Sequence, residues 1–224
     1  MSFMRLLTQK FELPTAAEAL PGRADPHRPG VRHAIFDRPL DGPRPAGCRQ
    51  VLLGMGCYWG GERRFWSLPG VVLTAAGYAG GHTPNPTGAE VASGRTGHAE
   101  VVAVTYDPAV LPLAVLLLHF WEGHDPTQGM RQGDDIGTQF RSLLLLPDAE
   151  DLAVAEASRA DYAAALKAAG HPRAITTTLA IHTRFYLAED YQQQHLARVP
   201  GASCTTKGCG VPARPRSASG EAVT

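Results

Sequence analysis

The sequence predicts one catalytic domain of the α/β or α+β class, and three observations predict it. The chain has 224 residues, enough for one compact domain with an ample core. Between residues 46 and 198, strand-like and helix-like patterns alternate. The flanks differ: residues 1–45 contain seven prolines and predict an N-terminal arm that packs over the core, with a disordered tail as the alternative. Residues 199–224 are rich in Gly, Pro and Ser and predict a flexible tail.

The elements of the domain follow from local patterns. Residues 51–55 are mostly apolar between glycines, which predicts a buried strand. Residues 58–67 have helical spacing and stop at a Pro-Gly pair. Similar patterns predict strands at 71–78, 100–106, 140–146 and 176–181, and helices at 112–123, 148–169 and 189–198. Two long loops, 82–97 and 125–139, interrupt them, and loops of such length are usually functional.

Composition excludes several classes of function. Lys plus Arg equals Asp plus Glu at 21 each, so we expect no basic surface for nucleic acid. Residues 1–30 carry charge throughout without the apolar core of a secretory signal, and the stretch 111–121 is too short to span a bilayer. We therefore expect a cytoplasmic protein without a membrane partner, whose four cysteines are catalytic, redox-active or inert rather than structural disulfides.

Cys57 is the first candidate for chemistry, since it lies where a predicted strand gives way to a predicted helix. Unpaired backbone N–H groups at a helix start stabilise a thiolate and lower its pKa. Gly56 and Gly60 leave space for a ligand beside the sulfur. The alternative is a buried, inert cysteine. The glycine-rich turn lacks the third glycine of a dinucleotide site and the Lys-Ser/Thr of a P-loop, so neither nucleotide motif applies.

Several sequence blocks extend this pattern. GMGCYWG at 54–60 is followed by AGYAGG at 76–81, PNPT at 84–87, GHAE at 97–100, HDP at 124–126, QGMRQG at 128–133 and GTQ at 137–139. In this order they closely resemble the signature of the A-class peptide methionine sulfoxide reductases, over at least residues 19–210. The resemblance implies a ferredoxin-like two-layer sandwich, with a mixed sheet and extensive coil. It also implies reduction of methionine-S-sulfoxide, free or in proteins, without a cofactor.

The resemblance assigns roles to single residues. Cys57 is the nucleophile, Glu100 the proton donor, and Asp135 a supporting carboxylate. Attack on the sulfoxide leaves a sulfenic acid on Cys57, which a second thiol must resolve. The family pattern makes Cys204 that thiol and Cys209 a relay to thioredoxin, the final reductant. The other residues expected to contact substrate are Tyr58 and Trp59, which form the methyl pocket, and positions 88 and 140. We expect Glu100 to be largely buried, because an acid near pH 7 needs a raised pKa. A zinc site at the tail cysteines is a weak alternative without a second pair of ligands, and no role can be assigned to Cys48.

The chain departs from the family pattern near this site. Tyr58 replaces a phenylalanine, whereas Gly88 and Phe140 each replace a tyrosine. Gln192 and His195 replace a histidine and a tyrosine. Loss of a donor from an electrophilic site typically costs about 10²–10³ in rate. Three hypotheses stay open: ordinary reduction with Tyr58 supplying a replacement hydroxyl, a specialised enzyme for another sulfoxide or S-oxygenated molecule, and a non-catalytic sulfoxide-binding or redox-sensing protein.

Overall fold

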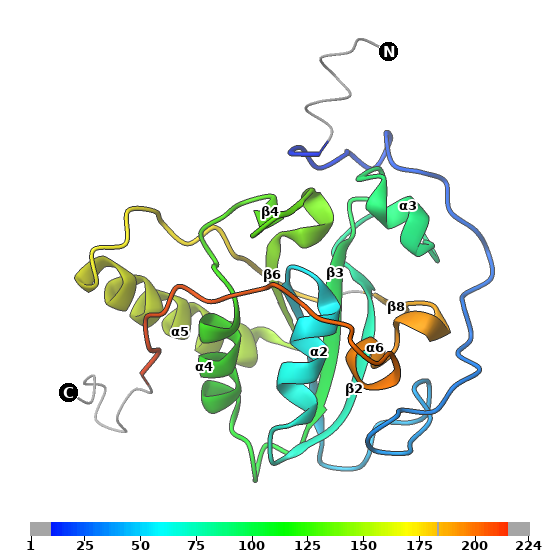
Figure 1. Ribbon diagram of the computed structural model, residues 1–224, viewed down its shortest axis with the longest axis horizontal. Coiled ribbons are helices and arrows are strands. Elements are labelled where there is room, and N and C mark those ends of the chain that lie inside the picture. Colours follow the sequence, from blue (N-terminus) through cyan, green and yellow to red (C-terminus); the bar gives the residue numbers. More distant parts are fainter. Residues whose placement is uncertain (1–9, 183, 215–224) are drawn as a thin grey trace.

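A six-stranded sheet forms the centre of the molecule in the computed structural model, which describes residues 10–182 and 184–214 (Figure 1). The strands are β1 (Arg49–Met55), β2 (Val71–Ala79), β3 (Ala99–Tyr106), β4 (Arg131–Gln132), β5 (Asp135–Ile136), β6 (Ser142–Leu146), β7 (Thr178–Ile181) and β8 (Phe185–Leu187). The helices are α2 (Tyr58–Trp66), α3 (Gly88–Ala92), α4 (Leu113–Gly123), α5 (Ala149–Ala168) and α6 (His195–Arg198), with 3-10 turns η1 (Thr138–Phe140) and η2 (Asp190–Gln192). None of the helices in the described part of the chain is both long and apolar enough to cross a membrane.

The strand order of the large sheet is β7-β6-β1-β3-β2-β8. Neighbouring strands are antiparallel except β6 and β7, which run parallel. The sheet is therefore mixed, and the predicted α/β class is confirmed. Helices α2 and α4 both pack into the larger core, so they lie over the same face of the sheet.

The two faces of the sheet are covered differently. Val51 and Leu53 of β1 pack into the larger core with α2, α4 and α5, whereas Leu52 between them faces the opposite side. This alternation is the ordinary period of a strand. On the opposite side the cover is coil from the N-terminal arm, which contributes Leu40 and Val31. The arm thus packs over a sheet face that would otherwise expose apolar side chains.

The prediction of one continuous helix at 189–198 is wrong, because this segment forms two short elements, η2 and α6. The Gln193 amide donates to the carbonyls of Ala76 and Ala188. Gln194 adopts a left-handed conformation, and both its backbone and side-chain N–H groups donate to the buried carboxylate of Glu62. These tertiary hydrogen bonds replace the bonds that a continuous helix would form.

The two predicted loops contain short elements that periodicity did not reveal. The loop at 82–97 contains α3, whose start is held by a capping box between Thr87 and Glu90. The loop at 125–139 contains the small hairpin β4–β5 and then η1. Each element is too short for a hydrophobic period to appear in the sequence.

Candidate functional site

Cys57 is the residue that precedes the first turn of α2, at the end of the connection from β1. Gly56, just before it, has φ +85°, a conformation that favours glycine. The backbone N–H groups of the first turn of α2 have no partner within the helix. Of these, the Trp59 N–H favours a thiolate on Cys57, and the Tyr58 N–H donates to Glu100 Oε2 at 3.2 Å.

Glu100 enters the site from β3, the strand next to β1 in the sheet. Its carboxyl is largely buried, as expected for an acid that acts near neutral pH. Burial raises the pKa of this carboxyl to about 8, against the hydrogen bond from Tyr58. The charges of Asp135 and Cys204 raise the pKa further. At neutral pH Glu100 therefore holds a proton beside Cys57 and can donate it.

Cys204 meets Cys57 at the start of α2, although 147 positions separate them in the sequence. The two sulfurs share a hydrogen bond. This bond lowers the pKa of Cys204 to about 5, against burial and with help from Thr206 and the backbone of Gly60. The same bond, burial and the Glu100 charge raise the pKa of Cys57. Contrary to the expectation from the helix start alone, the pKa of Cys57 is therefore raised in the closed pair.

Gly60 makes room for this meeting of thiols. A Cβ atom at position 60 would lie 2.4 Å from Cys204 Sγ, closer than atoms can approach. The space that the sequence suggested for a ligand is thus occupied by the tail cysteine. On its other side, Cys204 Sγ lies 3.3 Å from Thr206 Oγ1.

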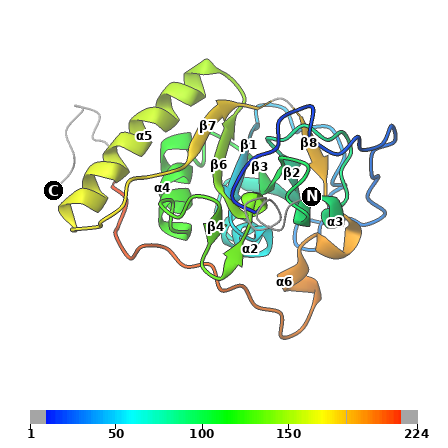
Figure 2. The same cartoon turned by 90° about the horizontal axis from the view of Figure 1, so that it is seen from above.

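The tail follows a defined path along the helical side of the molecule as far as residue 214, as Figure 2 shows. Gly208 packs so closely on α4 that a Cβ there would lie 2.0 Å from the Glu122 carbonyl oxygen. Beyond it, the Tyr162 hydroxyl donates to the Val211 carbonyl at 3.1 Å, and the Ala213 N–H donates to Glu122 Oε1 at 2.9 Å. These contacts hold the tail across α4 and α5.

Cys209 lies against Asp125, away from Cys57 and Cys204. Burial, together with the charge and hydrogen bond of Asp125, raises the pKa of Cys209 to about 12. Hydrogen bonds from Thr127 and Gln128 overcome burial and lower the pKa of Asp125 itself to about 2. The structure therefore brings Cys204 to the nucleophile but keeps Cys209 as a protonated thiol elsewhere.

Asp125, His171 and Cys209 also form the candidate metal cluster of the described residues, with one ligand atom from each lying within 4.8 Å of the others. However, the Asp125 carboxylate already accepts hydrogen bonds from Thr127 and Gln128 and pairs with Arg173 at 2.9 Å. A cation would have to displace that guanidinium. The donor set is thus better explained as an anchor for the tail.

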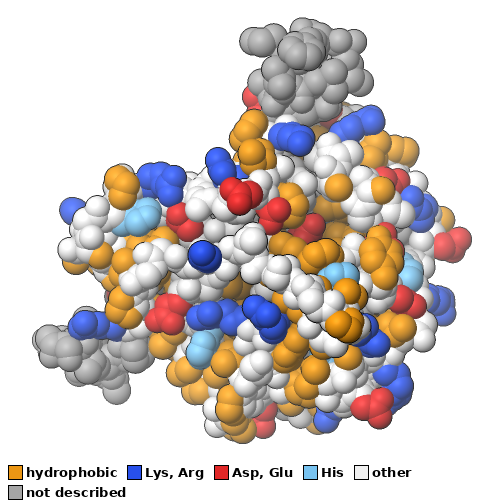
Figure 3. All heavy atoms as spheres, in the orientation of Figure 1, with side chains coloured by type: hydrophobic (Ala, Val, Ile, Leu, Met, Phe, Trp, Pro, Cys, Tyr) orange, Lys and Arg blue, Asp and Glu red, His pale blue; other side chains and the backbone are white. Residues whose placement is uncertain are grey.

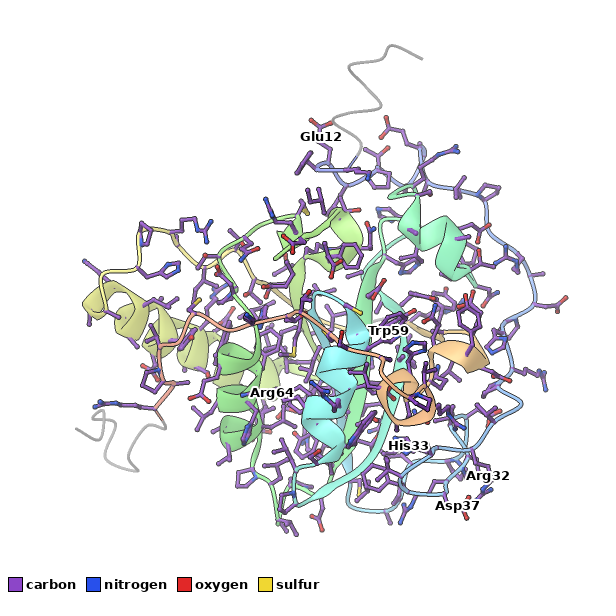
Figure 4. The ribbon with its side chains drawn as sticks, viewed as in Figure 1. Glu12, Arg32, His33, Asp37, Trp59 and Arg64 are labelled. Atoms are coloured by element: carbon purple, nitrogen blue, oxygen red, sulfur yellow. The ribbon has the colours of Figure 1, made fainter. Side chains whose placement is uncertain are left out.

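The predicted aromatic wall follows Cys57 directly. Tyr58 is buried at 4% exposure, and its hydroxyl lies 3.3 Å from the hydroxyl of Tyr78. The Trp59 indole stacks on His195 at 3.9 Å between ring centroids, and its N–H donates to Gln192 Oε1 at 2.9 Å. Figure 4 shows Trp59 between α2 and the α6 region. The two substituted residues from the late motif therefore hold the indole in place.

Gly88 does not open an empty space. A Cβ atom at position 88 would lie 2.8 Å from the Tyr78 hydroxyl and 3.3 Å from Glu189 Oε2. Tyr78 donates to Glu189 Oε2 at 2.9 Å, and the Gly88 N–H donates to Glu189 Oε1 at 2.8 Å. The Tyr58–Tyr78–Glu189 hydrogen-bonded chain thus fills the position beside Gly88.

The remaining predicted residues lie in the loop before β6. Asp135 belongs to β5 and is partly buried, and its charge reaches Glu100. Burial and the neighbouring charge of Asp134 raise the pKa of Asp135. Phe140 ends η1, is half-buried and carries no hydroxyl to donate. Asp135 therefore acts on the site electrostatically, because its charge raises the pKa of Glu100.

Sequence reasoning missed the roles of several residues at the site. Tyr78 and Asp125 lay within recognised blocks without an assigned role, and Glu189 was read only as the start of a helix. Gln192 and His195 were noticed as substitutions but not as partners of Trp59. No local pattern marks such residues, because each acts through a partner that is distant in sequence.

Comparison with known proteins agrees with this geometry. The family model "Peptide methionine sulfoxide reductase" matches residues 49–214. The chain is 58% identical over 199 residues to the peptide methionine sulfoxide reductase MsrA of Rhodospirillum centenum, covering 89% of this chain and 90% of that protein. It is 53% identical over 211 residues to the protein of the same name from Brucella ovis, covering 94% and 96%.

Solved structures show the same likeness. The structure of methionine sulfoxide reductase A of Corynebacterium diphtheriae superposes with a TM-score of 0.77 at 39% identity, covering 90% of this chain and 99% of that one. The structure of Mxr1 from Saccharomyces cerevisiae in reduced form superposes with a TM-score of 0.67 at 32% identity, covering 74% of this chain and 94% of that one. Together with the family match, these relatives show that the chain belongs to the peptide methionine sulfoxide reductase family.

Proposed function

We propose that the protein reduces methionine-S-sulfoxide, free or in proteins, to methionine through a sulfenic acid on Cys57. One observation carries the proposal: Cys57 lies at the start of α2 between a carboxyl that is protonated at neutral pH and a second thiol. Nucleophile, acid and resolving group are the three components that the reaction requires. A purely sulfoxide-binding or redox-sensing protein has no need of the acid beside the two thiols.

The first step begins when substrate displaces Cys204 from Cys57. Without that hydrogen bond, the Trp59 N–H stabilises the Cys57 thiolate, which attacks the sulfoxide sulfur. Glu100 protonates the departing oxygen, which ends on Cys57 as a sulfenic acid, and methionine leaves. Tyr58 and Trp59 form the wall against which the methyl group packs, and Asp135 helps to keep Glu100 protonated.

The second step uses the tail. Cys204 attacks the sulfenic sulfur of Cys57, a disulfide forms, and water leaves. Cys209 then attacks Cys204 to give a Cys204–Cys209 disulfide and free Cys57. Thioredoxin reduces this last disulfide. Since the structure anchors Cys209 at Asp125, the tail must detach for this exchange.

The organisation that we propose has three parts: an arm at 1–45, a catalytic domain at 46–198 and a tail at 199–224 that carries the resolving thiols. The arm covers the outer sheet face, and the tail reaches the nucleophile. The residues beyond 214 lie outside the described part of the tail. Because all four cysteines are unpaired, we place the protein in the reducing cytoplasm.

The specialised alternative depended on extra space at Gly88. Because Tyr78 and Glu189 fill that position, no observation favours a bulkier sulfoxide. Tyr58 is also a weak replacement donor: Tyr78 donates to Glu189, so the Tyr58 proton points to the Tyr78 oxygen. Catalysis then depends on Glu100 as the principal acid.

The test is turnover of the two methionine sulfoxide epimers, as a blocked amino acid, with dithiothreitol. We expect S-epimer-selective reduction that is lost in Cys57→Ser and kept in the matched control Cys48→Ser. Equal use of both epimers, or turnover without Cys57, would contradict the proposal. A Gly88→Tyr variant that gained activity would show that the missing phenol limits the reaction despite the filled space.

A further inference from the structure

A cavity with a volume of about 430 Å³ lies beside Cys204 of the thiol pair. None of Tyr58, Trp59 or Glu100 lines it. Pockets for small ligands span about 300–1,000 Å³. The cavity is lined by α2, by the ends of β1 and α4, and by the tail, through Met55, Gly60, Gly61, Arg63, Arg64, Ser67, Gly123, Cys204 and Thr206.

The lining of this cavity is positively charged. Arg63 is exposed and pairs with no carboxylate among the ion pairs of the described residues. Arg64 donates through Nε to the His119 carbonyl at 2.7 Å and lies 3.7 Å from Glu122, which leaves other guanidinium N–H groups free for a ligand. Figure 3 shows Lys and Arg side chains side by side over α2, and Figure 4 shows Arg64 between α2 and α4.

The cavity also offers one reactive atom, because Cys204 is part of its lining whereas Cys57 is not. A carboxylate held by the two guanidiniums would thus lie next to the sulfur that ends up in the Cys57–Cys204 disulfide. Charge-assisted hydrogen bonds of this kind are the stronger ones available to arginine.

We propose that this cavity binds a small thiol carrying one or two carboxylates, which reduces the Cys57–Cys204 disulfide directly. The inference rests on the proposed function, which forms that disulfide. It adds a route of recycling that bypasses the Cys209 relay. An anion without a thiol would occupy the same cavity but would inhibit rather than reduce.

The exchange has two balanced steps. The bound thiolate attacks Cys204 Sγ, the bond between the two protein sulfurs breaks, and Cys57 leaves as a thiolate that the Trp59 N–H stabilises. A second molecule of the thiol attacks the mixed disulfide, releasing Cys204 and a small-molecule disulfide. Two electrons pass from two small thiols to the protein.

The test compares three small thiols as reductants of the full-length protein: mercaptosuccinate, which is anionic; 2-mercaptoethanol, which is neutral; and cysteamine, which is cationic. Each protein carries Cys209→Ser, which prevents exchange of Cys209 with the Cys57–Cys204 disulfide. The rate of reduction of that disulfide is measured for this parent, for Arg63→Gln and for Arg63→Glu. Lys167→Gln, an exposed charge on α5, is the matched control. Ratios of variant to parent rates cancel the intrinsic reactivity of each thiol.

We expect Arg63→Gln to slow reduction of the disulfide by mercaptosuccinate about five-fold, as for the loss of one partly exposed charge pair. The rate of reduction by 2-mercaptoethanol should stay within about two-fold of the parent rate. Arg63→Glu should slow reduction by mercaptosuccinate further and should speed reduction by cysteamine. Salt at about 0.5 M should remove the difference between the parent and the Arg63 variants in their rates with charged thiols, because it screens the charges. Equal changes for all three thiols would overturn the proposal. If the protein never forms the disulfide during sulfoxide turnover, the proposed function fails, and this inference fails with it.

Discussion

Cys204 and Cys209 lie five positions apart on one extended tail, yet their surroundings shift the pKa values of their thiols in opposite directions. Cys204 accepts a hydrogen bond from Cys57, and its pKa falls to about 5. Cys209 is buried against the Asp125 carboxylate, and its pKa rises to about 12. The comparison teaches that the pKa of a thiol depends on what the thiol packs against. The tail sequence supplies two similar cysteines, and the domain makes one reactive and the other inert.

The largest expected effect comes from removing the partner of Cys204. Cys57→Ser should lower sulfoxide turnover by more than about 10³, the loss typical of removing a nucleophile. Cys57→Ala, which unlike serine carries no hydroxyl that could donate to Cys204, should also return the pKa of Cys204 toward its ordinary value, slowing alkylation of Cys204 at pH 6 by about ten-fold or more. Mass spectrometry of the alkylated tail measures the second effect. Unchanged alkylation of Cys204 would contradict the hydrogen-bonded pair.

The next largest effect on turnover is expected from replacing Glu100, the carboxyl beside that thiol pair. Glu100→Gln should lower turnover by about 10²–10³, the usual contribution of a positioned acid. Because burial raises the pKa of Glu100 to about 8, its acid form is present below that pH and is lost above it. Turnover of the parent enzyme should therefore fall as pH rises through about 8. A pH–rate profile with the same alkaline limb in Glu100→Gln would assign that limb to another group.

The inert thiol can be made reactive by removing its carboxylate. Asp125→Asn should lower the pKa of Cys209 and speed its alkylation at pH 7 by about ten-fold or more. Alkylation of Cys204 should stay unchanged, which sharpens the contrast between the two thiols. Thr127→Val, which removes a donor to Asp125 but no charge, is the control. If Cys209 alkylation were equally slow in all three proteins, burial alone would explain its inertness.

The smallest effect concerns the contact between Cys204 and α2. Gly60→Ala places a Cβ 2.4 Å from Cys204 Sγ and should push the tail away from Cys57. We expect formation of the Cys57–Cys204 disulfide to slow about five-fold, while the first methionine is released at the parent rate. Rapid-mixing measurement of methionine and of free thiols separates the two steps. Equal rates of disulfide formation would show that the tail can reach Cys57 from another direction.

The sequence by itself determined the α/β class and most of the strands and helices, and it marked Cys57 as a candidate for chemistry. The alternation of apolar residues and the glycine-rich turn before Cys57 are local signals, so they can be read without knowing the fold. The resemblance then predicted roles for Cys57 as nucleophile and for Glu100, Asp135, Cys204 and Cys209.

Only the tertiary structure decided how these residues act on one another. It broke the helix at 189–198, because Gln193 and Gln194 bond to β2, to the Ala188 carbonyl and to Glu62 rather than along a helix. It filled the space beside Gly88 with Tyr78 and Glu189, and it reversed the pKa expected for Cys57 by bringing Cys204 to it. The physical reason is common to all three: desolvation and hydrogen bonding depend on distances between residues that are far apart in the chain.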